Sequence, residues 1–239
     1  MITKLESLAK DWQANGYPQI TDRLNADAQE ARRLGAPETF PSVATPESLE
    51  IPAVSEKLYV KTRKELEKQG LEFVVVNPES IDQLATNEEA RSLFGYINRS
   101  EKMRSNIPPQ IEVAIDPNHF RIEGSNRLST DDQIEKIKHQ EAMLKGKLPE
   151  DVKNLISMRM PEHASLLVQL DLEYQKRKRK ALFTNWFGRT DDQTFLGLVA
   201  IVGRFDPTGR LLVDGWPRGI GSDFLFAVPV VVLPRKLAV

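Results

Sequence analysis

Five consecutive cations at residues 176–180 are followed by a stretch rich in aromatic residues that includes Phe183 and Phe187. Flexible cations bind phosphate groups and exposed rings stack on unpaired bases, so this combination is typical of sites for single-stranded nucleic acid. No acidic residue interrupts the chain from Gln175 to Thr190. The segment therefore predicts binding of RNA, DNA or another polyanion. The predicted contact residues are Lys176, Arg177, Lys178, Arg179, Lys180, Trp186 and Arg189.

A structural explanation of the same segment is commoner. If the five cations end a helix, steps of 100° direct them all round its axis, so they form a knob and no stripe along a groove. Cations at that end also complement the negative pole of the helix dipole. The rings of ALFTNWF, residues 181–187, then pack into the core ahead of a strand. A nuclear localisation signal has the same composition.

A second candidate is the glycine-rich stretch DGWPRGIGSD, residues 214–223. Its glycines allow backbone amides to approach an anion, over which Arg218 could close. No Lys-Ser or Lys-Thr pair follows the glycines, so the stretch does not match a phosphate loop. The favoured interpretation is a hairpin loop, with Trp216 covering the sheet.

The third candidate is IDPNHFRIEGSN, residues 115–126, in which Asp116, His119 and Glu123 could hold a divalent ion. The Pro117 turn displaces Asp116 from the face that His119 and Glu123 share in an extended chain, so a structural turn is favoured. Ser125 stands where a restriction-type nuclease needs a lysine. No metal site is predicted.

The two remaining histidines are weaker candidates for a functional site. His139 lies opposite the apolar face of its expected helix, and His163 is expected to be buried and bonded to backbone. No serine elbow and no zinc-protease motif occur, so no catalytic residue is assigned. The sequence gives no reason to expect a cofactor.

Three functions from different classes remain open. Binding of a nucleic acid or other polyanion comes first. An assembly protein that clasps a protein partner or a second copy of itself through residues 1–54 is the first alternative. A small hydrolase or transferase with a pocket near Trp216, Arg218 and His119 is the second.

Composition limits these choices. The chain has 239 residues, 28% of them charged, and a formal net charge of −1, which provides no global field for a polyanion or a membrane. Residues 151–239 contain 13 Lys and Arg against 9 Asp and Glu, and the five consecutive cations supply that excess. The absence of cysteine excludes disulfides and thiolate sites and fits a reducing cytoplasm. The longest apolar run has ten residues, so we expect a soluble protein without a membrane partner.

The expected fold class is α+β, with an N-terminal helical appendage, a helical middle region and a C-terminal antiparallel β meander. Residues 1–35 form the appendage, residues 36–54 a proline-rich linker or arm, and residues 55–239 the body. In the appendage, Leu5, Leu8 and Trp12 share one helical face, which predicts docking on the body or on a partner. No internal repeat is found.

In the body, the β-branched run 71–77 and the alternation in 110–116 predict strands. Helices are expected after 55, around 88–94, from Thr130 with Gln133 at capping-box spacing, and after Pro149 and Pro161. The last of these helices is apolar on two sides, so we expect it to lie between two layers. Residues 194–205, 211–216 and 224–233 are the meander strands, with a turn at 206–209 and an edge or bulge at Pro229.

Overall fold

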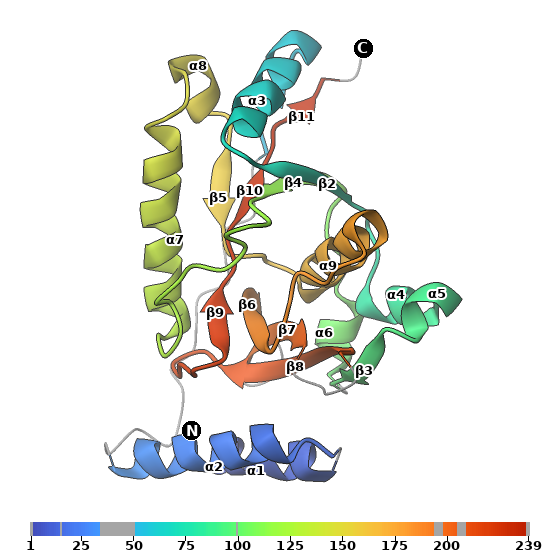
Figure 1. The fold of residues 1–239 in the computed structure, drawn as a ribbon, viewed down its shortest axis with the longest axis vertical. Helices are drawn as coiled ribbons and strands as arrows, with labels where there is room; N and C mark the ends of the chain where they lie inside the picture. The colour runs from blue at the N-terminus through green and yellow to red at the C-terminus, as the bar shows by residue number, and fades with distance from the viewer. Residues whose placement is uncertain are drawn as a thin grey trace.

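The computed structural model describes residues 2–14, 16–33, 51–98, 100–193, 198–204 and 209–237. It has the predicted α+β class, with a helical N-terminus and C-terminal strands (Figure 1). The helices are α1 Ile2–Ala14, α2 Pro18–Arg33, α3 Glu56–Lys68, α4 Ile81–Thr86, α5 Glu88–Arg91, α6 Glu101–Ser105, α7 Thr130–Lys145, α8 Glu150–Lys153 and α9 Ala164–Lys178. The strands are β1 Ala53–Val54, β2 Glu72–Val76, β3 Phe94–Ile97, β4 Ile111–Ile115, β5 Ser157–Arg159, β6 Trp186–Gln193, β7 Leu198–Arg204, β8 Leu211–Pro217, β9 Leu225–Ala227, β10 Val230–Val232 and β11 Arg235–Lys236.

A five-stranded sheet has the order β3-β8-β7-β6-β9. Its middle is an antiparallel meander of β6, β7 and β8, and its two edge strands run parallel to their neighbours. The meander was predicted, but its members differ. Residues 186–193, expected to precede it, form β6, while residues 224–233 do not pair with β8.

That last apolar run is divided between two sheets at Pro229. β9 lies at an edge of the five-stranded sheet, and β10 is a central strand of an antiparallel sheet with the order β2-β4-β10-β5. The prediction of one continuous third meander strand is therefore wrong. The missing N–H of Pro229 is tolerated because the residue lies in the link between the sheets, outside either ladder.

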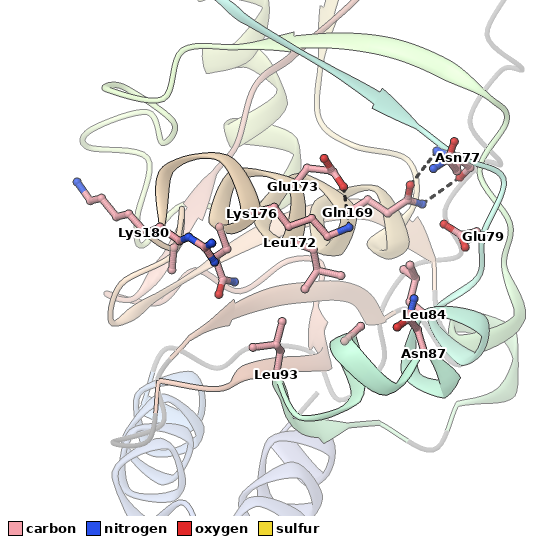
Figure 2. A pocket seen from close by; sticks show the side chains of 14 residues that line it. Asn77, Glu79, Leu84, Asn87, Leu93, Gln169, Leu172, Glu173, Lys176 and Lys180 are labelled. Atoms are coloured by element: carbon pink, nitrogen blue, oxygen red, sulfur yellow. Dashed lines mark hydrogen bonds and ion pairs between the residues drawn. The ribbon is translucent and has the colours of Figure 1, made fainter.

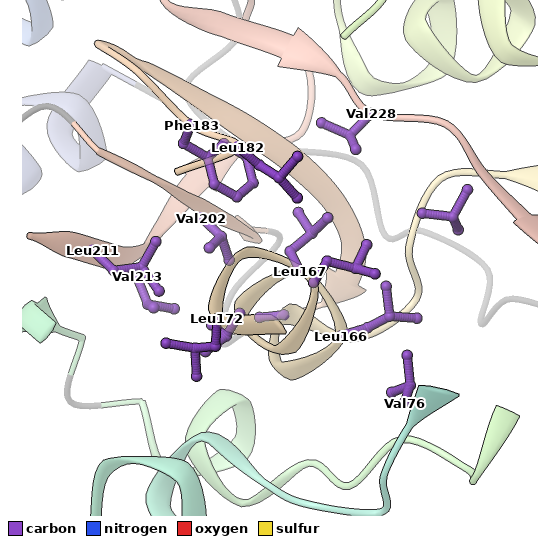
Figure 3. Close-up of a cluster of buried hydrophobic side chains, with 14 of the residues drawn as sticks. Val76, Leu166, Leu167, Leu172, Leu182, Phe183, Val202, Leu211, Val213 and Val228 are labelled. Atoms are coloured by element: carbon purple, nitrogen blue, oxygen red, sulfur yellow. The ribbon is translucent and has the colours of Figure 1, made fainter. Parts of the chain in front are cut away.

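Helix α9 lies between the two sheets, as its two apolar sides predicted (Figure 1). Its residues 164–172 are all buried. Figure 3 shows Leu166 on the side of Val76 of β2, whereas Val202 and Val213 of the five-stranded sheet lie on another side of the helix. The helix thus joins both sheets into one core.

The N-terminal helices cover the opposite face of the five-stranded sheet. Trp12, Leu5 and Leu24 are buried with Leu212 and Trp216 of β8. The predicted apolar face of α1 is therefore correct, and the appendage docks on the body. Most of the expected linker lies outside the described residues, which omit 34–50. Its last two residues form β1, which pairs in parallel with β11.

Two details at helix starts correct the sequence interpretation. The side chain that caps α7 belongs to Ser129, which accepts a hydrogen bond from the Asp132 amide at 3.2 Å, and Thr130 is the first helical residue. The N-cap of α9 is His163, which is half-buried and whose Nδ1 has no partner among the described residues. His139 is exposed, as predicted.

Candidate functional site

A cavity of about 550 Å³ lies between the C-terminal half of α9 and the segment that contains α4 and α5 (Figure 2). Three cations of the basic run, Lys176, Arg179 and Lys180, line it. The predicted anion-binding segment thus borders a concave site, but only part of the segment does so.

The end of α9 places these cations. Arg179 adopts a left-handed conformation, with φ 55°, and its amide donates to the Gln175 carbonyl at 2.9 Å. This C-cap stops the helix and turns Lys180 and Ala181 along the cavity. Three residues on, the Leu182 amide donates to buried Asp171 at 2.8 Å, which fixes the chain as it leaves the site.

The five cations have different partners. Arg177 donates to the Phe73 carbonyl at 2.8 Å, and Lys178 pairs with Glu72 at 3.1 Å, so both are held against β2. Lys176 pairs with Glu173 at 3.1 Å. Arg179 and Lys180 are exposed and have no ion pair within the described part of the chain. Among the described residues, no acidic side chain forms an ion pair with either of these two charges.

The aromatic half of the predicted nucleic-acid site lies in the core. Phe183 is 1% exposed, Trp186 5% and Phe187 0%. The rings of Phe183 and Trp186 pack at 4.8 Å, and Phe187 faces the N-terminal helices. The expectation that Trp186 contacts bases is therefore corrected, because its ring faces are covered by protein.

Arg189 is also a core residue. Its side chain is fully buried, and it donates to the carbonyls of Leu128, at 3.1 Å, and Ile220. Burial, together with the nearby Arg218 charge, lowers the pKa of Arg189 to about 9. The guanidinium ties two loops together and is closed to an external anion, so Arg189 is not part of the site.

The remaining lining of the cavity comes from residues that the sequence analysis did not assign to any site. Leu84, Leu93 and Leu172 supply apolar surface, and Glu79 with Asn77 follows the end of β2. A capping box, in which Ser80 and Gln83 bond reciprocally, starts α4 directly after Glu79. The Gln169 amide holds the Asn77 backbone at 2.8 and 3.0 Å, which attaches this end of the cavity to α9.

In the glycine-rich stretch, Arg218 and Trp216 both have partners within the protein. Arg218 pairs with Asp131 at 2.7 Å and with Asp191, so its charge is already used. Trp216 is fully buried beneath the N-terminal helices, and its Nε1 donates to the Ile220 carbonyl at 3.1 Å. The predicted hairpin is also wrong, because the chain passes from β8 to β9 at the far edge of the sheet.

The histidine candidate lies elsewhere. His119 Nδ1 and Asp116 Oδ2 are 2.9 Å apart, and both residues line a separate cavity of about 440 Å³. The Asp116 side chain accepts hydrogen bonds from the Asn118 and His119 amides, as expected of a turn. Neither Trp216 nor Arg218 lines that cavity, so the predicted convergence of these three residues is wrong.

The described ranges contain neither a metal-binding cluster nor a membrane-spanning helix. No three His, Asp or Glu side chains there lie close enough together to share a metal ion. No helix in those ranges combines the length and apolar character needed to cross a membrane.

Comparison of the chain with protein-family models, with curated proteins and with solved structures finds no match.

Proposed function

We propose that this protein binds a small organic anion in the cavity between α9 and the α4–α5 segment. The observation that carries the proposal is the position of Arg179 and Lys180 on the cavity lining, without ion-pair partners in the described ranges. A volume of about 550 Å³ falls in the usual range for small-molecule sites. Apolar side chains beside a few charged groups are the usual lining of such sites.

Charge balance at the helix end supports an anionic ligand. The last carbonyls of α9 carry the negative pole of its dipole, which one or two cations suffice to complement. Lys176 and Lys178 already have acidic partners, and Arg177 donates to a carbonyl. Arg179 and Lys180 therefore add positive potential at the cavity that the described residues do not neutralise.

A small ligand fits better than a nucleic-acid strand. Sequence-tolerant binding of single strands relies on rings that are open to bases. The rings after the basic run are buried, and two of the five cations are held against β2. Of the basic run, the residues left for binding are the cations at the rim of the cavity beside α9.

The experiment compares octanoate with its neutral analogue octanamide by isothermal titration calorimetry. Octanoate should bind the wild-type protein more tightly than octanamide. Replacing both Arg179 and Lys180 by Ala should weaken octanoate binding about tenfold, since two partly exposed charge contacts are lost. Octanamide binding should not change.

Lys178→Ala provides the matched control. It removes one cation from the same helix end, but that cation pairs with Glu72. Octanoate affinity should stay within about twofold of wild type, because screening at a surface leaves little long-range effect. Equal losses in Lys178→Ala and in the double variant would overturn the proposal, as would equal affinity for octanamide and octanoate.

A further inference from the structure

The charges on the cavity lining are separated. Figure 2 shows Glu79 beside Leu84 and Asn87, whereas Lys180 extends on the opposite side, past Leu172. The cavity therefore has an acidic end at the start of α4 and a basic end at the close of α9. Apolar side chains and the Glu173–Lys176 ion pair lie between the two.

Glu79 differs from the second carboxylate of the cavity. Glu173 is neutralised by Lys176 at 3.1 Å. For the half-buried Glu79 side chain, the described residues include neither a hydrogen-bond donor nor a cation in contact. The start of α4 next to Glu79 favours a negative charge, but a six-residue helix does not neutralise it. A partly desolvated carboxylate gains from a cationic partner.

From this separation we infer that the ligand is zwitterionic, with a protonated amine against Glu79 and a carboxylate or phosphate against Arg179 and Lys180. The inference rests on the proposed anion binding. Leu84, Leu93 and Leu172 fit an aliphatic or aromatic body that joins the two charged ends of the ligand. Amino acid derivatives with a long apolar spacer are the simplest members of this class.

Three straight-chain probes with eight carbon atoms each separate the contributions. They are 8-aminooctanoate, which carries both charges, octanoate, which carries only the anion, and octylammonium, which carries only the cation. The wild-type protein should bind 8-aminooctanoate about fivefold more tightly than octanoate, because the amine adds one partly buried ion pair. Octylammonium should bind more weakly than 8-aminooctanoate.

Variants assign each end. Glu79→Gln should reduce 8-aminooctanoate affinity to that of octanoate and leave octanoate affinity equal or higher. Glu79→Asp keeps the charge and should retain part of the preference for the amine. Thermal unfolding of each variant without ligand separates a loss of binding from a loss of folding.

The outcomes distinguish the two proposals. If octanoate affinity does not depend on Arg179 and Lys180, the proposed anion binding fails. If octanoate binding depends on these cations but 8-aminooctanoate binds no more tightly, the zwitterion inference alone is overturned. Equal losses for octanoate and 8-aminooctanoate in Glu79→Gln, with unfolding unchanged, would also overturn it.

Discussion

At the scale of single residues, Asp214 is a carboxylate placed on an apolar face. It shares the side of β8 that carries Leu212 and Trp216, beneath the N-terminal helices, and is 1% exposed. Asn98 Nδ2 and the Gly215 amide, the latter at 2.7 Å, donate hydrogen bonds to it. Burial raises the pKa of Asp214 from 3.8 to about 7, against the lowering effect of these donors.

Replacing Asp214 with Asn should remove a pH dependence of stability. Between the unfolded pKa of 3.8 and the folded pKa of about 7, the folded state keeps a proton that the unfolded state releases. Wild-type stability should therefore fall as pH rises through this window, by at most about 1.4 kcal/mol per pH unit from this group, and level off above it. Urea unfolding of both proteins from pH 5 to pH 8 measures the difference. Parallel curves would contradict the assignment.

Gly221 has a different constraint. A Cβ at this position would overlap backbone atoms of Arg127. Backbone atoms cannot move aside as the end of a flexible side chain can. Gly221→Ala should lower the free energy of unfolding by about 2 kcal/mol or more.

Gly146→Ala is the control for this prediction. Gly146 has helical φ and ψ, and a Cβ there would meet its nearest carbonyl oxygen at 3.5 Å, an ordinary contact. The substitution should leave stability unchanged or raise it by about 0.5 kcal/mol. Equal losses in the two variants would show that the close approach at Gly221 is not responsible.

At the scale of elements, α9 is held between the sheets by a buried ion pair as well as by apolar contacts. Asp171 accepts from Arg204 of β7 at 2.6 Å, and both side chains are almost inaccessible. Asp171 also receives the Leu182 amide at 2.8 Å, so one carboxylate connects α9, β7 and the segment beyond the cavity.

Arg204→Ala should destabilise the protein by about 3 to 5 kcal/mol, because it leaves the Asp171 charge buried without its cation. Chemical denaturation measures the loss. Arg104→Ala removes the exposed pair with Asp82 and should change stability far less. A small effect of Arg204→Ala would contradict the role of this buried ion pair in stability.

At the scale of the whole molecule, α1 and α2 shield an aromatic face of the five-stranded sheet. Phe187, Leu212, Trp216 and Phe224 lie under these helices with Trp12. Exposed apolar patches of this kind promote association. The arrangement therefore bears on the predicted alternative that residues 1–54 mediate assembly.

Deleting residues 1–33 should cause self-association, since it uncovers this face. The assembly alternative predicts the reverse, a change from oligomer to monomer. Light scattering coupled to size-exclusion chromatography decides between them. Leu24→Asp, which places a charge in the buried contact, should act like the deletion, whereas Asp22→Asn on the exposed side should have no effect.

Nucleic-acid binding can be tested through the three tryptophans, all of which are at most 5% exposed. Addition of polyuridylate should leave tryptophan fluorescence unchanged, since no indole face is open to a base. Any binding seen by anisotropy should depend on the cations and weaken with salt. Quenching that disappears in Trp186→Phe would contradict the buried position of this ring.

Several features follow from the sequence by itself. The α+β class, the docking face of α1, the two-sided character of α9 and the strands at 72–76 and 111–115 all follow from local periodicity and residue type. The position of the basic run at the end of a helix could also be predicted, because a run of cations and a helix terminus are both local features of the sequence. Periodicity reports which faces are apolar, and it is set by neighbouring residues.

The tertiary structure decided what each face meets. Strand order, the division of the last apolar run at Pro229 and the burial of Trp186 depend on segments far apart in the chain. The cavity also depends on such segments. Glu79 and Lys180 are about a hundred residues apart in the chain, and only packing places both on the lining of one cavity. Which segments contact each other over long range depends on how the whole chain packs its apolar surface. A pattern of neighbouring residues therefore does not encode these contacts.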